Sequence, residues 1–304
     1  MAAARTWKSK KRFLHQRSGD WNCVVSLSQF IADLPENPRS RLAPTPSGFL
    51  HRGNAFNFLL TWTLVRQKHG TLHLRIDDLD SARRRLEYIE DIFESLGWLG
   101  IEWDSGPRNS TEQQNIFSQV LRLRRYHDLI QKLIDQGHCF ACTCSRTEIG
   151  PVYPGTCEAK NLALDEPGTS IRLRVQPDEI VQIKDRVTTS FAIGQETGSF
   201  VIRRKDGLPS YQIASVADDE DMQMNLIVRG VDLLPSTAMQ TLIAEKAGLL
   251  NFKNTVFVHH SLITKDGEKL SKSAGAESLR VLRQGGEEAA RRLCREFEVW
   301  ANAL

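Results

Sequence analysis

Residues 41–54 read RLAPTPSGFLHRGN, and this stretch decides the fold. Its first three residues predict a short extended piece, which the segment from Pro44 to Gly48 interrupts. A helix is then predicted from near His51 to just before Gly70. Apolar residues separated by three or four positions predict that this helix buries one face; they are Phe56, Leu59, Leu60 and Leu64.

Strand and helix patterns alternate before and after a middle region whose sequence pattern differs from theirs. After the first helix, residues 72–76 predict a strand and residues 83–96 a second helix. Later in the chain, strands are predicted at 200–202, 226–228 and 256–258, and helices at 211–222 and 236–247. Such repeats are typical of an open parallel sheet. The sequence therefore predicts an α/β protein whose split, Rossmann-like parallel sheet holds an inserted domain at about residues 104–198.

Composition narrows the class of protein. The chain has 304 residues, about two domains' worth, with 40% hydrophobic and 25% charged residues and a net charge of +3. No run approaches the ~20 apolar residues of a bilayer span, so a transmembrane protein is excluded. Six cysteines are too few for a disulfide scaffold, and four of them lie between Cys139 and Cys157. This clustering indicates metal or reactive thiols in a reducing compartment, and we expect a cytoplasmic protein.

The amino-terminal segment has a different character. Its first nineteen residues contain six lysines and arginines and no acidic residue, without helical or strand periodicity. We expect residues 1–40 to form a basic, disordered extension. A secretory signal is excluded because no apolar stretch follows the basic residues. An organellar transit peptide and a translation start further along the chain are the alternatives.

Residues 46–54 carry a first candidate ligand site. They lie between the end of a predicted strand and the start of a helix, where open α/β sheets bind ligands and unpaired helix N–H groups favour anions. His51 could donate to a phosphate oxygen, Gly53 would let a purine approach the backbone, and Asn54 adds a polar contact. Taken alone, this pattern is equally typical of an ordinary capped helix start.

Residues 265–273, which read KDGEKLSKS, carry a second candidate site after the last predicted strand. Lys269 and Lys272 lie three positions apart on a loop that is well suited to hold a triphosphate. Alone it would be a solvated basic loop. Together the two motifs occur in the order and at the places of the HIGH and KMSKS motifs, and the chain resembles the class I aminoacyl-tRNA synthetases.

Further motifs resemble the glutamyl branch of that family. They are RLAPTPSG at 41–48, LRIDDLD at 74–80, Tyr211, and VRGVDL at 228–233. Only 31 residues follow Ser273 (304 minus 273), too few for an anticodon-binding domain. In this respect the chain resembles the glutamyl-queuosine tRNA(Asp) synthetases, which activate glutamate and place it on queuosine in the anticodon of tRNA(Asp).

The resemblance implies a glutamate pocket built by residues 41–45, 77, 211 and 229. Its members are Arg41, Ala43, Thr45, Asp77, Tyr211 and Arg229. An arginine is well shaped to bind a carboxylate through two parallel N–H bonds. Asp77 departs from the branch, which has glutamate there, so the carboxylate expected to meet the substrate ammonium is one methylene shorter.

The clustered cysteines predict a metal site with two alternative ligand sets. From the residues alone, Cys139, Cys142, Cys144 and Cys157 would form a tetrahedral all-cysteine zinc site. The resemblance instead implies a structural zinc ion held by Cys142, Cys144, Tyr153 and Cys157. A third alternative is a set of reduced, metal-free cysteines that act as small hydrophobic residues.

The resemblance also implies which domain each segment belongs to and which residues act in the reaction. Residues 41–103 and 199–260 would be the two halves of the nucleotide-binding domain, 104–198 an inserted acceptor-type domain with the zinc site, and 261–304 the KMSKS-type loop with a C-terminal helical segment. His51, Lys269 and Lys272 would be catalytic and, with Gly53 and Asn54, would bind ATP, which Mg²⁺ accompanies.

The implied function is ATP-dependent activation of L-glutamate to glutamyl-adenylate and its transfer to queuosine in tRNA(Asp). The expected partners are ATP, L-glutamate and that tRNA, bound by a monomer without a membrane. The alternatives are a minimal glutamyl-tRNA synthetase that charges tRNA(Glu), and a non-catalytic paralogue that binds tRNA or adenylate.

Overall fold

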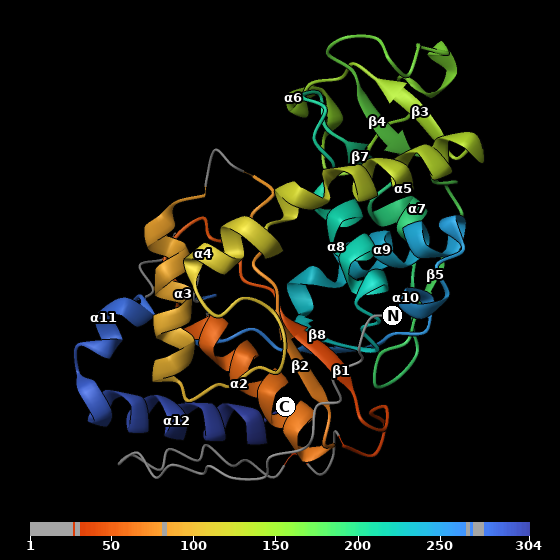
Figure 1. Ribbon diagram of the computed structural model, residues 1–304. Helices are drawn as coiled ribbons and strands as arrows, with labels where there is room; N and C mark the ends of the chain where they lie inside the picture. The colour runs from red at the N-terminus through yellow and green to blue at the C-terminus, as the bar shows by residue number, and fades with distance from the viewer. Residues whose placement is uncertain (1–26, 28–30, 81–83, 266–267, 270–276) are drawn as a thin grey trace, which may run out of the picture.

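Two pairs of parallel strands form the centre of the fold (Figure 1). The computed structural model describes residues 27, 31–80, 84–265, 268–269 and 277–304. In it β1 (Arg39–Leu42) pairs with β2 (Thr71–Leu74), and β8 (Leu226–Gly230) pairs with β9 (Val256–His260). The pairs adjoin where the backbone N–H of Asn225 donates to the carbonyl of Arg39 at 3.0 Å. These pairings confirm the predicted split parallel sheet.

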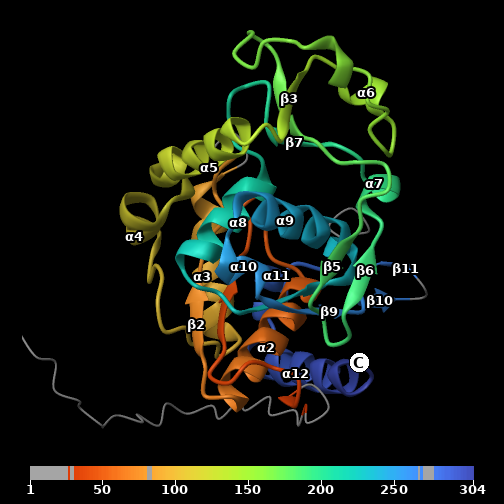
Figure 2. The same cartoon turned by 90° about the vertical axis from the view of Figure 1, so that its right-hand side faces the viewer.

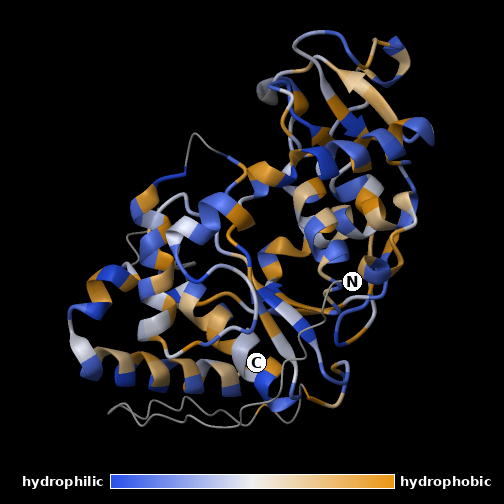
Figure 3. Cartoon of the chain, in the orientation of Figure 1, coloured by the Kyte–Doolittle hydropathy of each residue, from blue (hydrophilic) through white to orange (hydrophobic). Residues whose placement is uncertain are grey.

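One face of this layer is covered by α2 (Arg52–Gln67), whose buried side chains share a core with Leu42 and Leu74. α3 (Leu86–Trp98) and α12 (Gly286–Asn302) close the same core. Phe297 of α12 meets Phe56 of α2 edge to face, with ring centroids 5.7 Å apart. Hydrophobic and hydrophilic residues alternate along α12, as expected for a helix that buries one side (Figure 3).

The other face of β1 and β2 carries charged side chains. Neighbouring residues of a strand point to opposite faces, so Arg41 points away from the core that holds Leu42. It meets α8 (Tyr211–Asp221), which packs against α5 (Leu123–Asp135) and α9 (Leu234–Ala247) in a second core. α8 and α9 confirm the helices predicted at 211–222 and 236–247.

The inserted region has its own antiparallel sheet, at the top of the molecule in Figure 1. Its strands are β3 (Cys139–Cys142), β4 (Ser170–Leu173) and β7 (Phe200–Arg203). The expectation that residues 200–202 belong to the parallel sheet was wrong, because β7 pairs antiparallel with β4. The apolar alternation at 200–202 identifies a strand but contains no information about its partner.

A hairpin, β5 (Val181–Ile183) and β6 (Thr189–Phe191), extends from the inserted region along α9 to β9 (Figure 2). Phe257 of β9 donates its backbone N–H to the carbonyl of Lys184 at 2.7 Å. The apolar residues of the hairpin belong to the second core, which they share with α9 and β9. The inserted region and the nucleotide-binding half are therefore packed together.

The amino-terminal extension is shorter than residues 1–40. β1 begins at Arg39, and Leu27 and Leu34 are 1% and 5% exposed in the first core. The expected disorder was therefore wrong for residues 31–40, because apolar side chains in this lead-in are buried. Residues 1–26 and 28–30 lie outside the described residues.

Short elements complete the described part of the chain. They are α4 (Ser110–Glu112), α6 (Arg146–Ile149), α7 (Ile193–Glu196), α10 (Leu250–Lys253), α11 (Leu279–Arg283), β10 (Thr264–Lys265), β11 (Glu268–Lys269) and four π or 3₁₀ turns at 113–117, 119–122, 158–160 and 231–233. α11 and α12 form the predicted C-terminal helical segment. No helix within the described ranges is long and apolar enough to cross a bilayer.

Candidate functional site

A cavity of about 160 Å³ lies where β1 and β2 end. Its lining residues are Thr45, Asp77, Leu79, Asp80, Gln119, Arg204, Pro209, Tyr211 and Ala214. The structure thus brings together three predicted residues, since Thr45 follows β1, Asp77 follows β2 and Tyr211 opens α8. The loop that carries Ala43 and Thr45 is held to the end of β2 by a hydrogen bond from the Asp77 N–H to the Pro44 carbonyl (2.9 Å). This is the edge at which parallel sheets bind ligands.

A buried ion-pair network holds Asp77, which lines the cavity. Arg75 holds both carboxylate oxygens of Asp77, with Nε–Oδ1 2.6 Å and Nη2–Oδ2 3.2 Å. Arg75 Nη1 and Arg41 Nε both donate to Oδ1 of Asp219, at 2.7 and 3.0 Å. Burial raises the pKa of Asp77 and Arg75 partly offsets this, whereas Arg41 and Arg75 outweigh burial and lower the pKa of Asp219. Asp77 therefore reaches the cavity already oriented by Arg75, whereas Arg41 does not line the cavity and is paired with Asp219.

Asp218 and Asp219 of α8 organise this network, and sequence reasoning missed both. Asp218 accepts hydrogen bonds from Gln119 Nε2 (2.9 Å), Arg122 Nε (2.6 Å) and the Tyr126 hydroxyl (2.9 Å). Both aspartates are fully buried. A detectable signal was present, because two adjacent acids in a predicted helix next to an apolar run are costly unless they are paired.

Arg229 is a predicted ligand whose buried guanidinium is only partly hydrogen-bonded. It lies on β8, is 3% exposed, and donates through Nη1 to Gln240 Oε1 (2.8 Å) and Thr237 Oγ1 (3.2 Å). Its Nε and Nη2 have no hydrogen-bond acceptor among the described residues. Burial lowers its pKa to about 10 and nearby Tyr211 opposes this shift, so the guanidinium stays charged. The two unused N–H groups form one edge of the guanidinium, which matches the two oxygens of a carboxylate.

His51 lies at the amino end of α2 and caps it. Its Nδ1 accepts the backbone N–H of Gly53 at 3.1 Å, and Asn54 Oδ1 accepts the His51 N–H at 3.0 Å. A Cβ at residue 53 would lie only 2.9 Å from Cε1 of His51, so glycine is needed for this arrangement. Because Nδ1 accepts, the neutral imidazole carries its proton on Nε2, which can donate to an anion. Gly53 and Asn54 thus orient His51.

The segment that follows the second motif meets the amino end of α2. Residue 278 forms a backbone bridge with His51, and the Leu279 N–H donates to the Leu50 carbonyl at 2.7 Å. β11, which includes Lys269, pairs antiparallel with β10. Lys272 lies outside the described residues, and so does the side chain of Lys269. Of the described residues that flank the predicted phosphate loop, Ser278 and Leu279 lie next to the amino end of α2.

Three of the clustered cysteines converge in the inserted region. The Sγ atoms of Cys142, Cys144 and Cys157 all lie within 4.8 Å of one another. The Tyr153 hydroxyl lies 3.6 Å from Cys142 Sγ and accepts the Cys157 N–H at 2.9 Å. Burial raises the pKa of Cys157, but hydrogen bonds from Thr143 and other neighbours outweigh it and lower that pKa to about 6. Such a thiol is readily deprotonated for metal binding.

Cys139 does not join this group. It lies three residues before Cys142 on β3, and residues three apart in a strand point to opposite faces. Its side chain packs against the second core, and burial raises its pKa to about 12. The arrangement thus favours the ligand set with Tyr153 over the all-cysteine set.

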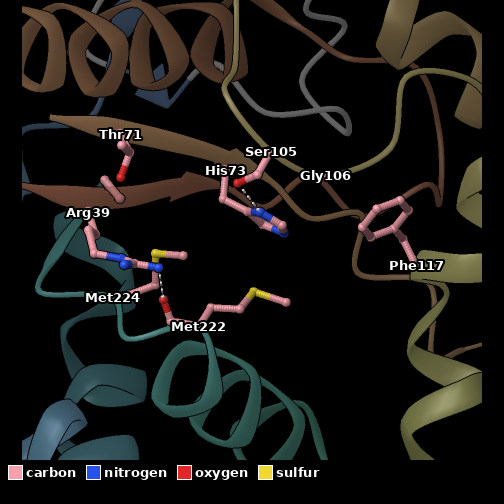
Figure 4. Close-up of a pocket in the computed structure, with 9 residues that line it drawn as sticks. Arg39, Thr71, His73, Ser105, Gly106, Phe117, Met222 and Met224 are labelled. Carbon is pink, nitrogen blue, oxygen red and sulfur yellow. Dashed lines mark hydrogen bonds between the residues drawn. The ribbon is translucent and has the colours of Figure 1, made fainter. Parts of the chain in front are cut away.

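A second cavity, of about 250 Å³, lies toward the amino ends of β1 and β2 (Figure 4). It is lined by Arg39, Ser40, Thr71, His73, Ser105, Gly106, Phe117, Met222 and Met224. His73 Nδ1 lies 2.8 Å from Ser105 Oγ, and burial together with Arg75 lowers the pKa of His73 to about 4. No sequence motif predicts this cavity or includes the residues that line it.

We expect His73 to make the protein less stable as the pH falls from about 6.5 to about 4. In this window the unfolded chain takes up a proton at His73 while the folded protein does not, so unfolding is favoured by up to about 3 kcal/mol at the acid end. Urea unfolding of wild type and His73→Gln at pH 7.5 and 4.5 measures the effect. Between pH 7.5 and pH 4.5 the free energy of unfolding should fall more for wild type than for His73→Gln. A difference between the two proteins that does not depend on pH would contradict the expectation.

Comparison with known proteins agrees with this geometry. The family described as tRNA synthetases class I (E and Q), catalytic domain, matches residues 38–152 and 155–294. The chain is 37% identical over 265 residues to the glutamyl-Q tRNA(Asp) synthetase of Pseudomonas putida (strain W619), which covers 82% of this chain and 85% of that protein. It is 36% identical over 261 residues to the glutamate–tRNA ligase of Lawsonia intracellularis (strain PHE/MN1-00), which covers 81% of this chain and 53% of that protein.

A solved structure has the same fold. The glutamate tRNA ligase of Elizabethkingia meningosepticum CCUG26117, in complex with its amino acid, superposes with a TM-score of 0.66 at 26% identity. The match covers 79% of this chain and 53% of that chain. The chain thus spans about half the length of the glutamate–tRNA ligases that it matches.

Proposed function

Because the chain belongs to the class I (E and Q) tRNA synthetase family, we propose that it activates L-glutamate with ATP and transfers the glutamyl group to queuosine in tRNA(Asp). The observation that carries the activation step is the buried Arg229, whose Nε and Nη2 donate to no described residue and whose guanidinium is near enough to Tyr211, a residue of the cavity, to be influenced by it. The similarity to a protein named glutamyl-Q tRNA(Asp) synthetase supports the choice of acceptor.

In the proposed complex, glutamate occupies the cavity at the ends of β1 and β2. One carboxylate binds the open edge of Arg229, and the ammonium group meets Asp77, whose oxygens keep a lone pair beyond those that Arg75 uses. Thr45 and Tyr211 border the substrate from either side, and the predicted ligands Arg41 and Ala43 lie on β1 and the loop after it. The second carboxylate is left to react.

That carboxylate attacks the α-phosphorus of ATP, and pyrophosphate leaves. His51 Nε2–H at the start of α2 would stabilise the charge that grows on the phosphate oxygens, with Gly53 and Asn54 holding the imidazole. Lys269 and Lys272 are proposed to stabilise the departing pyrophosphate, and Mg²⁺ would accompany ATP as a charge-neutralising ion. A hydroxyl of the cyclopentene diol of queuosine then attacks the mixed anhydride, and AMP leaves.

We also propose that Cys142, Cys144, Tyr153 and Cys157 hold one structural zinc ion. In a tetrahedral site with Zn–S bonds of about 2.3 Å, sulfur atoms lie about 3.8 Å apart. The three Sγ atoms, which lie within 4.8 Å of one another, fit that requirement with small adjustments. Zinc would supply a fixed cross-link between β3 and the loop at 153–157.

The proposal is tested by glutamate-dependent exchange of pyrophosphate into ATP, first without tRNA. We expect exchange without tRNA, because every residue proposed to contact ATP or glutamate belongs to this chain. Transfer is then measured with labelled glutamate and queuosine-containing tRNA(Asp), followed by mapping of the labelled nucleotide. Label on the terminal ribose of tRNA(Glu) would replace the proposed acceptor, and no exchange under any condition would overturn the activation step.

Asp77→Glu is expected to lower the KM for glutamate. The added methylene carries the carboxylate about 1.5 Å further into the cavity, toward the ammonium group. A restored charge-assisted hydrogen bond would lower KM by up to about tenfold, with little change in kcat. Exchange kinetics of both proteins decide it. An unchanged or higher KM would mean that the pair with Arg75 already sets the right reach and that the larger side chain overfills the cavity.

A further inference from the structure

We propose that Asp185, on the β5–β6 hairpin of the inserted region, is a positioning residue for Arg229 and acts through His259 and Thr237. The inference rests on the proposed function, in which Arg229 binds the substrate carboxylate. His259 Nδ1 lies 2.5 Å from Asp185 Oδ2, and its Nε2 lies 2.8 Å from Thr237 Oγ1. Thr237 Oγ1 in turn accepts Nη1–H of Arg229 at 3.2 Å.

The hydrogen positions along these contacts are constrained. A carboxylate only accepts, so His259 Nδ1 carries a proton toward Asp185. If Nε2 is bare, the Thr237 hydroxyl donates to it; if Nε2 is protonated, it donates to Thr237, which then donates to the Leu233 carbonyl 3.1 Å away. In both cases a lone pair of Thr237 remains for Arg229. Asp185 therefore fixes the imidazole that fixes the acceptor of Arg229.

The series of contacts from Asp185 to Arg229 is buried, and the turn that carries Asp185 is anchored. The side chains of His259 and Asp185 are 4% and 15% exposed, and Thr237 is fully buried. The turn that carries Asp185 is tied to β9 by the bond between Phe257 N–H and the Lys184 carbonyl, and Lys184 Nζ donates to Asn254 Oδ1 at 2.8 Å. The β5–β6 hairpin, whose turn carries Asp185, thus lies along α9 and against β9 (Figure 2).

Arg229 depends on this support because, among the described residues, no carboxylate accepts a hydrogen bond from it. Within the described part of the chain, its Nη1 donates to Thr237 and Gln240, which are neutral acceptors on α9. The direction of the opposite edge, Nε and Nη2, follows from how Nη1 is held, since the guanidinium is planar. Loss of the Asp185 carboxylate should therefore misalign the edge that meets glutamate, and leave the ATP site at the start of α2 unchanged.

The test compares Asp185→Ala, Asp185→Asn and wild type in pyrophosphate exchange. We expect the glutamate KM of Asp185→Ala to rise about tenfold with an unchanged ATP KM, and Asp185→Asn, whose amide oxygen still accepts from Nδ1–H, to recover most of the difference. Glu179→Gln is the matched control. It removes another ion pair between the inserted region and α9, Glu179 Oε1 with Lys246 Nζ (2.8 Å), that does not touch this chain of contacts.

The inference would be overturned if Asp185→Ala had the same glutamate KM as wild type. It would also be overturned if the substitution raised the KM for ATP as much as the KM for glutamate, or if Glu179→Gln raised the glutamate KM equally. Stabilisation of the protein by L-glutamate in thermal unfolding separates this inference from the proposed reaction. If wild type binds glutamate without exchange, loss of that stabilisation in Asp185→Ala supports the positioning role while the reaction fails. If wild type binds no glutamate, both are overturned.

Discussion

Replacing Arg229 by methionine is expected to abolish glutamate activation. The substitution keeps an unbranched side chain in the buried site but removes both N–H groups of the edge proposed to bind the substrate carboxylate. Loss of a buried, charge-assisted pair costs about 3 kcal/mol or more, so kcat/KM for glutamate should fall by more than about a hundredfold. Pyrophosphate exchange measures the loss.

Arg204→Met is the matched control for this prediction. Arg204 lines the cavity, but its side chain is 43% exposed and already pairs with Asp206. An exposed arginine of this kind contributes little, so we expect less than about a fivefold change. Thermal unfolding with and without glutamate completes the test: Arg229→Met should lose the stabilisation by glutamate that wild type shows. Equal losses in the two variants would remove Arg229 from its proposed role.

Cys157→Ser is expected to abolish metal binding and to disorder the end of the inserted region. Structural zinc supplies about 10 kcal/mol or more of apparent binding free energy in small zinc-dependent folds. The small core around the cysteines contains few other residues, with Phe140, Cys142, Tyr153 and Cys157 buried. Zinc content should fall from one ion per chain to near zero, and limited proteolysis should cleave near residues 143–160.

Two further variants separate the alternative ligand sets. Cys139→Ser should keep the zinc ion, because Cys139 points to the other face of β3 and packs in the second core. Tyr153→Phe should weaken zinc binding, because its hydroxyl is the fourth group next to the three sulfurs. Loss of zinc in Cys139→Ser together with retention in Tyr153→Phe would contradict the proposed site and restore the all-cysteine alternative.

The local elements of the nucleotide-binding fold were predictable from the sequence. Apolar residues three or four positions apart predicted α2, and the helices expected at 211–222 and 236–247 match α8 and α9 within a few residues. The resemblance, and not the cysteine spacing alone, named the three cysteines that gather. Periodicity reports burial along one element, and that is the information these predictions needed.

Interactions between distant segments were not predictable in the same way. Asp219 meets Arg41 across 178 positions, and Asp185 meets His259 across 74, so no local pattern marks either pair. The partner of β7 was missed for the same reason, since its apolar residues suit either sheet. Resemblance named Arg41 and Asp77 as ligands but could not show that Arg75 and Asp219 hold them in place.

The second core has a consequence for modular exchange. It joins Leu173 and Ile183 of the inserted region to Ala214 of α8 and Phe257 of β9. Excision of residues 104–198 would therefore strip apolar surface from both parts, which neither could cover alone. Only the distal piece around the cysteines has a small core of its own. Exchange of sequence between related proteins should therefore be tolerated in the piece around the cysteines. The β5–β6 hairpin and β7 must instead be kept together with the parallel-strand half of the protein.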